Sequence, residues 1–99
     1  MLQEESETMD KVEAYSILQK ELEKYQNMKY FDLKQLIGQA ITSEITAPST
    51  KLYQIEIQAM WDDKENEDIR VIASIDDMSW FAFSPITESI IMQPNGSLL

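Results

Sequence analysis

The chain has 99 residues, enough for one domain with one hydrophobic core, and its two glycines and three prolines favour a folded chain. It contains no cysteine and no histidine, which excludes disulfides, catalytic triads built on histidine and the usual zinc sites. The net charge of −10 repels nucleic-acid phosphates and anionic lipids, so we expect no nucleic acid and no membrane as partner, and a basic protein instead.

The N-terminal residues 1–10 do not have the pattern of a targeting signal. They are acidic and contain neither a basic segment nor an apolar run, so no secretory signal is expected. No apolar stretch in the chain approaches the roughly 20 residues that a membrane helix needs. We therefore predict a cytoplasmic protein with a single domain, residues 1–99, in which residues 1–8 are disordered.

A first helix is predicted over residues 9–27, where apolar residues recur at spacings of three and four and form one stripe. The stripe consists of Met9, Val12, Tyr15, Leu18, Leu22 and Tyr25. Thr8 is the expected N-cap, with Asp10 in the first turn. The opposite face carries charged residues, among them Glu13, and is expected to be solvated.

A second, shorter helix is predicted over residues 32–40. Asp32 and Gln35 have the spacing of a capping box, and apolar residues follow at helical intervals. Gly38 either lies inside this helix, at a cost of about 1 kcal/mol, or marks its end. Residues 9–40 are thus predicted to be helical.

Strands are predicted over residues 41–46, 51–61 and 69–75, because apolar and polar residues alternate there with the period of a half-buried strand. The clearest is residues 51–61, whose apolar positions are Tyr53, Ile55, Ile57, Ala59 and Trp61. A turn at residues 47–50 joins the first two strands.

The loop at residues 62–68 is predicted to close a hairpin. Opposed residues share a face in such a pair. The expected pairs are Trp61 with Ile69, Ala59 with Val71, Ile57 with Ala73, and Ile55 with Ile75. After a turn at residues 77–79, Ile75 is expected to pair with Phe81 and Ala73 with Phe83. A short apolar run at residues 90–92 and a turn at residues 94–96 follow.

These elements predict an α+β protein. One or two N-terminal helices are expected to pack on one face of a four- to five-stranded antiparallel meander sheet that spans residues 41–92.

The acidic residues of the 62–68 loop invite comparison with a calcium site, because hard cations bind several carboxylate oxygens. An EF-hand loop beginning at Asp62 would place Lys64 at a ligand position, Glu67 at the glycine position and Ala73 at the glutamate position, so that motif is excluded. A weak, irregular cation site is the alternative to a solvated loop. We predict no metal and no cofactor.

Catalytic chemistry finds little support in the chain. The second acidic pair, Asp76 and Asp77, is separated from the 62–68 loop by a strand of about 20 Å, too far for paired-carboxylate catalysis. Without histidine a serine nucleophile would need a lysine base, and no Ser-x-x-Lys spacing occurs. The protein is therefore predicted not to be an enzyme.

The two tryptophans are predicted to differ in role. Trp61 has the apolar parity of its strand and is expected in the core or at its edge, whereas Trp80 falls on the opposite face with Arg70 and several polar residues. Aromatic residues and arginine are typical of protein interfaces. The alternatives are that residues 86–92 cover Trp80, or that this face is simply exposed.

One resemblance extends over residues 53–96, under half of the chain. The residues that carry it are Trp61-Asp62-Asp63, Asp68-Ile69-Arg70-Val71, Ser74-Ile75-Asp76-Asp77, Ala82-Phe83-Ser84-Pro85 and Pro94-Asn95-Gly96. This stretch resembles a small family of uncharacterised bacterial proteins, which have a glycine-rich turn where this chain has Met78-Ser79. The resemblance implies a bacterial origin and a shared fold, and it brings no activity and no functional residues.

The function expected from the sequence is that of a non-catalytic acidic module that binds a basic protein, as an immunity protein or antitoxin does. Its predicted partner-binding residues are Trp61, Asp62, Asp63, Asp68, Arg70 and Trp80. The first alternative is a self-associating, homodimeric accessory domain. The second is a small-molecule sensor or enzyme with a pocket between helices and sheet.

Overall fold

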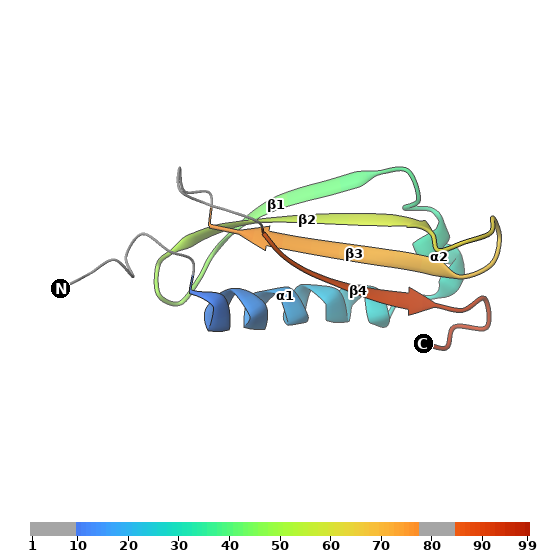
Figure 1. Ribbon diagram of the computed structural model, residues 1–99, viewed down its shortest axis with the longest axis horizontal. Helices are drawn as coiled ribbons and strands as arrows, with labels where there is room; N and C mark the ends of the chain where they lie inside the picture. The colour runs from blue at the N-terminus through green and yellow to red at the C-terminus, as the bar shows by residue number, and fades with distance from the viewer. Residues whose placement is uncertain (1–9, 78–84) are drawn as a thin grey trace.

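The structure, a computed structural model, describes residues 10–77 and 85–99 and has the predicted α+β fold (Figure 1). Its helices are α1 (Lys11–Gln26) and α2 (Tyr30–Lys34), and its strands are β1 (Ala40–Thr46), β2 (Leu52–Trp61), β3 (Ile69–Asp76) and β4 (Ile86–Met92). The strands form one antiparallel meander in the order β1-β2-β3-β4. Within these two ranges, no helix is long and apolar enough to cross a membrane.

Helix α1 begins later than predicted and buries a different stripe. Asp10 has an extended backbone and accepts a hydrogen bond from the Glu13 N–H at 3.1 Å, so Asp10 is the N-cap, and Thr8 lies outside the described residues. The fully buried stripe is Ala14, Leu18 and Leu22. Val12 is 82% exposed, and the predicted stripe was therefore rotated, because the small Ala14 faces the sheet.

Helix α2 is short and does not follow the predicted capping box. It begins after Lys29 and ends at Lys34, so Asp32 lies inside the helix and caps nothing with its side chain. Gly38 has φ +91°, a conformation that suits glycine, and it turns the chain into β1. The helix thus ends at Lys34, and the prediction of a helix through residue 40 was wrong.

The hairpin of β2 and β3 has the predicted register, with Trp61 opposite Ile69 and Ile55 opposite Ile75. The inward side chains of both strands form the middle of the core, and along β3 they alternate strictly with less buried residues. A shift of one residue would move every one of these apolar side chains to the other face, which is why the alternation specifies the register.

Strand β4 replaces the predicted partner of β3. Ile75 pairs with Ile86 and Ala73 with Glu88, so the predicted pairing with Phe81 and Phe83, which lie outside the described residues, is wrong. Because β4 lies beside β3 in the sheet, residues 86–92 do not form a layer over the outer face.

The C-terminal turn at residues 94–96 is confirmed. The Gly96 N–H donates to the Gln93 carbonyl at 2.8 Å, and the Leu99 N–H donates to Ile91 at 2.9 Å. The last residues thus return along β4.

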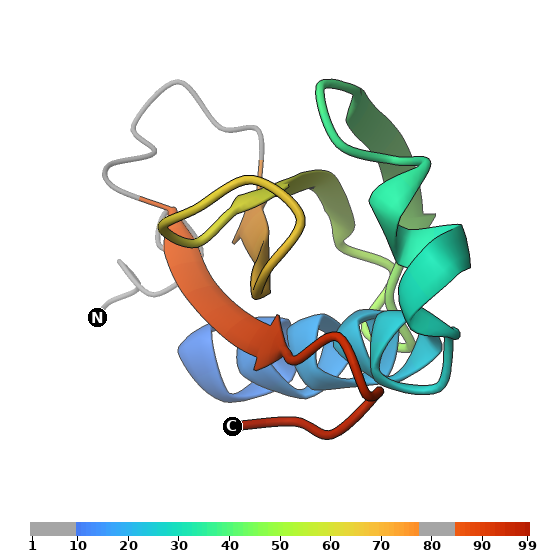
Figure 2. The same ribbon diagram turned by 90° about the vertical axis from the view of Figure 1, so that its right-hand side faces the viewer.

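Helix α1 covers only part of the sheet. It packs mainly on β3 and β4. Figure 2 shows β1 at the opposite border of the curved sheet, away from α1. The inward residues of β3 are fully buried, whereas Ile41 and Ile45 of β1 are only half-buried. The sheet therefore has a covered half and an open half.

Candidate functional site

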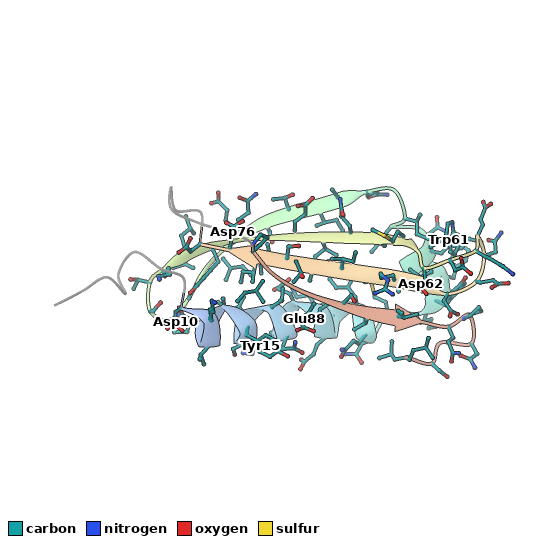
Figure 3. All side chains as sticks on the ribbon, in the orientation of Figure 1. Asp10, Tyr15, Trp61, Asp62, Asp76 and Glu88 are labelled. Atoms are coloured by element: carbon teal, nitrogen blue, oxygen red, sulfur yellow. The ribbon has the colours of Figure 1, made fainter. Side chains whose placement is uncertain are left out.

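The predicted partner-binding residues lie mostly at one end of the sheet. Trp61 is the last residue of β2, Asp62, Asp63 and Asp68 belong to the loop that follows it, and Arg70 is the second residue of β3. Trp80 lies outside the described residues. Figure 3 shows Trp61 and Asp62 at one end of the sheet and Asp76 at the other, so the two acidic clusters are separated as predicted.

The loop of residues 62–68, called here the acidic loop, is closed by its own hydrogen bonds. The Asp62 N–H donates to the Asp68 carbonyl at 2.9 Å, and Asn66 has φ +69°, a conformation that asparagine tolerates well. The Tyr30 hydroxyl donates to the Glu67 carbonyl and ties α2 to the loop. Desolvation, followed by the charges of Asp68 and Glu67, raises the pKa of Tyr30 above its ordinary value.

Most acidic side chains of the acidic loop are accessible to solvent. Asp63, Glu65 and Glu67 are exposed, while Asp62 and Asp68 are half-buried. Among residues 10–77 and 85–99, no three acidic side chains are arranged to hold a metal ion. The loop therefore offers a negative surface held on a closed backbone.

Arg70 and Asp62 contact each other. The Arg70 Nε donates to Asp62 Oδ1 at 2.8 Å, its Nη2 lies 2.7 Å from the same oxygen, and its Nη1 donates to Ser89 Oγ at 3.0 Å. Arg70 thus joins the loop to β3 and β4 on the face opposite α1. Both residues were predicted to bind a partner, but their charges neutralise each other and their first effect is to fix the base of the loop.

A hollow lies beside Trp61, where the chain between α2 and β1 runs along the end of β2. Its volume is about 460 Å³. The residues that line it are Ile37, Gly38, Gln39, Ala40, Gln58, Ala59, Met60 and Trp61. Trp61 is half-buried at the edge of the core, as predicted, and Lys34 Nζ lies 5.9 Å from the centre of its ring.

Sequence patterns did not reveal this hollow, called here the Trp61 hollow. It depends on the turn at Gly38 and on a parallel bridge between Ile37 and Ala59, two residues that the predicted helix would have kept apart. The one sequence signal for the hollow was Gly38, which was considered as an alternative end of the helix predicted over residues 32–40.

A second set of polar contacts lies at the other end of the sheet, around Glu13. Its carboxylate accepts from Ser49 Oγ at 2.7 Å, from the Ser49 N–H at 3.3 Å and from the Tyr53 hydroxyl at 2.9 Å. Burial, followed by the hydrogen bond to Glu13, raises the pKa of Tyr53 far above its ordinary value. Glu13 was predicted on a solvated face, but this set of contacts, called here the Glu13 clasp, fastens α1 to the β1–β2 turn.

Comparison with protein-family models, curated proteins and solved structures finds no match for this chain. The resemblance to a bacterial family over residues 53–96 therefore stays a prediction. We infer the function from the geometry of the chain itself.

Proposed function

We propose that this protein is a non-catalytic binding module that docks a basic partner protein at the acidic loop and the Trp61 hollow. Immunity proteins and antitoxins that neutralise a basic partner act in this manner. The observation that carries the proposal is that a loop with exposed carboxylates, among them Asp63 and Glu65, directly follows Trp61, which lines an apolar hollow.

Charge supports this choice of partner. The chain has a net charge of −10, and the exposed acids of the loop lie on a backbone closed by hydrogen bonds. A basic partner would be attracted over a distance of about 10 Å at moderate salt, which raises the association rate. The Asp62–Arg70 pair holds the loop in place, so little ordering entropy would be lost on binding.

The hollow adds an apolar component that charge alone lacks. Trp61 and Met60 line it, and tryptophan is enriched among the residues that dominate binding energy. A lysine or arginine of the partner can lay its aliphatic stem against this surface while its charged end reaches the acidic loop. The proposed contact is therefore with a basic side chain of a folded or extended partner segment.

The test is capture of proteins from the native host lysate on three baits: the wild type, E65Q/E67Q in the acidic loop, and the control E23Q/E56Q. The control removes the same two charges at exposed positions on α1 and β2. We expect one basic protein to bind the wild type and the control at low salt. It should be lost at high salt and bind E65Q/E67Q roughly tenfold more weakly when purified.

Equal binding by the two double variants would contradict a role for the acidic loop, as would capture that does not depend on salt. A Trp61→Ala variant tests the hollow separately, and its fold is checked by circular dichroism. A second candidate function, a homodimeric accessory domain, is favoured by a different feature, the open edge of β1.

A further inference from the structure

The two edge strands of the sheet differ, because the C-terminal residues cover part of β4 whereas β1 is an open edge among the described residues. Along β4, the returning C-terminus supplies the Leu99 N–H to Ile91 and a bridge between Leu98 and Met92. Along β1, the strand order places β2 on one side, and no other strand within residues 10–77 and 85–99 pairs with the outer side. Figures 1 and 2 show β1 at this border.

Natural edge strands are usually blocked by proline, lysine, a bulge or a very short length. β1 has seven residues, Ala-Ile-Thr-Ser-Glu-Ile-Thr, and pairs with β2 without a break in register. Glu44 is its only charged residue. The edge is therefore long and regular enough to accept another strand.

The backbone groups available at this edge follow from the register. The Ala47 N–H donates to the Lys51 carbonyl at 2.8 Å, in the same register that pairs Ile45 with Tyr53. Because successive residues of a strand direct their N–H and C=O groups to opposite sides, Ile41, Ser43 and Ile45 bond to β2. The N–H and C=O groups of Thr42 and Glu44 then point away from the sheet.

The two isoleucines of β1 are placed symmetrically about Ser43, one two residues before it and one two residues after it. We propose that β1 pairs antiparallel with β1 of a second copy of this chain, about a two-fold axis at Ser43, and joins the two sheets into one. Such an interface uses the same surface on both copies. Ser43 then lies opposite Ser43 of the second copy, and Ile41 opposite Ile45.

The two faces of this pairing are complementary. The backbone groups of Ile41 and Ile45 already bond to β2, so Ile41 meets Ile45 of the second copy in a non-hydrogen-bonded pair. Side chains approach most closely in pairs of this kind. These half-buried isoleucines lie on the core face of the sheet, beyond the strands on which α1 mainly packs. Thr42 exchanges both backbone hydrogen bonds with Glu44 of the second copy.

A second copy fits this edge because the symmetric placement of Ile41 and Ile45 about Ser43 brings isoleucine opposite isoleucine in the antiparallel pair. One charge opposes it, since the two Glu44 side chains become diagonal neighbours on one face. Salt should therefore strengthen the dimer, whereas salt weakens the binding of a basic partner to the acidic loop. The inference does not rest on the proposed function, and the opposite salt effects separate the two.

The test uses the absence of cysteine from the chain. In the proposed dimer, Ser43→Cys places two thiols directly across the two-fold axis, at a Cα separation within the roughly 4.4–6.8 Å range of disulfides. Thr46→Cys is the matched control, because residue 46 is also exposed on β1 but lies opposite Ala40 of the second copy. Under mild oxidation at about 100 µM protein, we expect at least tenfold faster formation of covalent dimer by S43C than by T46C.

Equal rates for the two cysteine variants would overturn the proposal. Sedimentation equilibrium of the wild type supplies an independent measurement. We expect reversible dimerisation that strengthens with salt, strengthens several-fold in Glu44→Gln and is lost in Thr42→Pro, which removes only an outward N–H. A wild type that stays monomeric at about 100 µM, or a Thr42→Pro variant that is folded and still dimeric, would refute it.

Discussion

The covered and open halves of the sheet contain similar strands in different surroundings. β1 and β3 both direct isoleucines to the core face, yet Ile69 and Ile75 of β3 are fully buried whereas Ile41 and Ile45 of β1 are half-buried. The difference comes from α1, which lies mainly over β3 and β4. Alternation therefore specifies which face of a strand is apolar, but a second layer decides how much that face contributes to stability.

The open half is attached to the rest of the fold by strand pairing and by polar contacts at both ends of β2. β1 pairs with β2 along its whole length, and the Glu13 clasp fixes the turn between them to α1. The acidic loop, at the far end of β2, is fastened by Arg70. One end of β2 is thus held by polar contacts to the distant α1, and the other by an ion pair between residues eight positions apart.

The largest expected effect on stability comes from truncating an isoleucine in the covered half and comparing it with one in the open half. Ile75→Ala in the covered half removes a side chain with 0% exposure and should lower the free energy of unfolding by about 2–5 kcal/mol. Ile45→Ala in the open half should cost only about 1 kcal/mol. Urea denaturation at dilute protein measures both. Equal losses would show that the two halves do not differ in energetic weight.

The Glu13 clasp gives the next effect. Tyr53→Phe removes a hydrogen bond to a carboxylate at a fully buried residue and should cost about 1–2 kcal/mol at pH 7. Tyr15→Phe, at an exposed position, is the control and should stay within about 0.5 kcal/mol.

The same tyrosine predicts how stability depends on alkaline pH. Its pKa is raised in the folded protein above the ordinary value of 10.0, so the unfolded chain loses this proton first. The contribution is fully present below pH 10 and is lost as the pH rises above that value. Unfolding measured from pH 8 to 11 should show a steeper decline in the wild type than in Tyr53→Phe, and parallel curves would contradict the assignment.

A smaller effect of opposite sign is expected at the turn that the clasp holds. Thr50 has φ +72°, which is unfavourable for a β-branched residue. Thr50→Asn should therefore stabilise the protein by about 0.5–1 kcal/mol. Thr46→Asn, in the extended conformation of β1, should instead destabilise it slightly. Thermal unfolding of the two variants compares them, and the same sign for both would argue against strain at Thr50.

The smallest effect is expected at the acidic loop. Asp62→Asn removes an ion pair whose side chains are 25% and 36% exposed and should cost about 0.5 kcal/mol. Raising the salt concentration should reduce this difference between the variant and the wild type. A cost above about 2 kcal/mol would mean that the loop is as integral to stability as the covered half.

The sequence predicted the strands and the register of β2 with β3 better than it predicted the partner strand of β3. The register of β2 and β3 followed from two uninterrupted alternations, of which Ile55 opposite Ile75 is one outcome. The partner of β3 was misplaced because the predicted turn at residues 77–79 was too short, and β3 instead pairs with β4 from Ile86 onward. Loop length is weakly encoded where no glycine marks the turn.

The candidate site was predicted only in its local part. The acidic loop and Trp61 are contiguous in sequence, so their proximity needed no knowledge of the fold. The Trp61 hollow depends on the chain reversal at Gly38, and the Glu13 clasp joins residues 36 and 40 positions apart. Contacts of this kind carry no periodic signal, since each depends on how two separate elements are placed against each other.

The position of α1 also has a consequence for synthesis of the protein. α1 is the first described element of the chain, but its apolar stripe packs on β3 and β4, and β4 is the last strand. While β1 and β2 emerge from the ribosome, α1 still lacks β3 and β4, the strands on which it mainly packs. The hairpins can form early because their strands are neighbours in sequence, but the core closes only when residues 86–92 have been made.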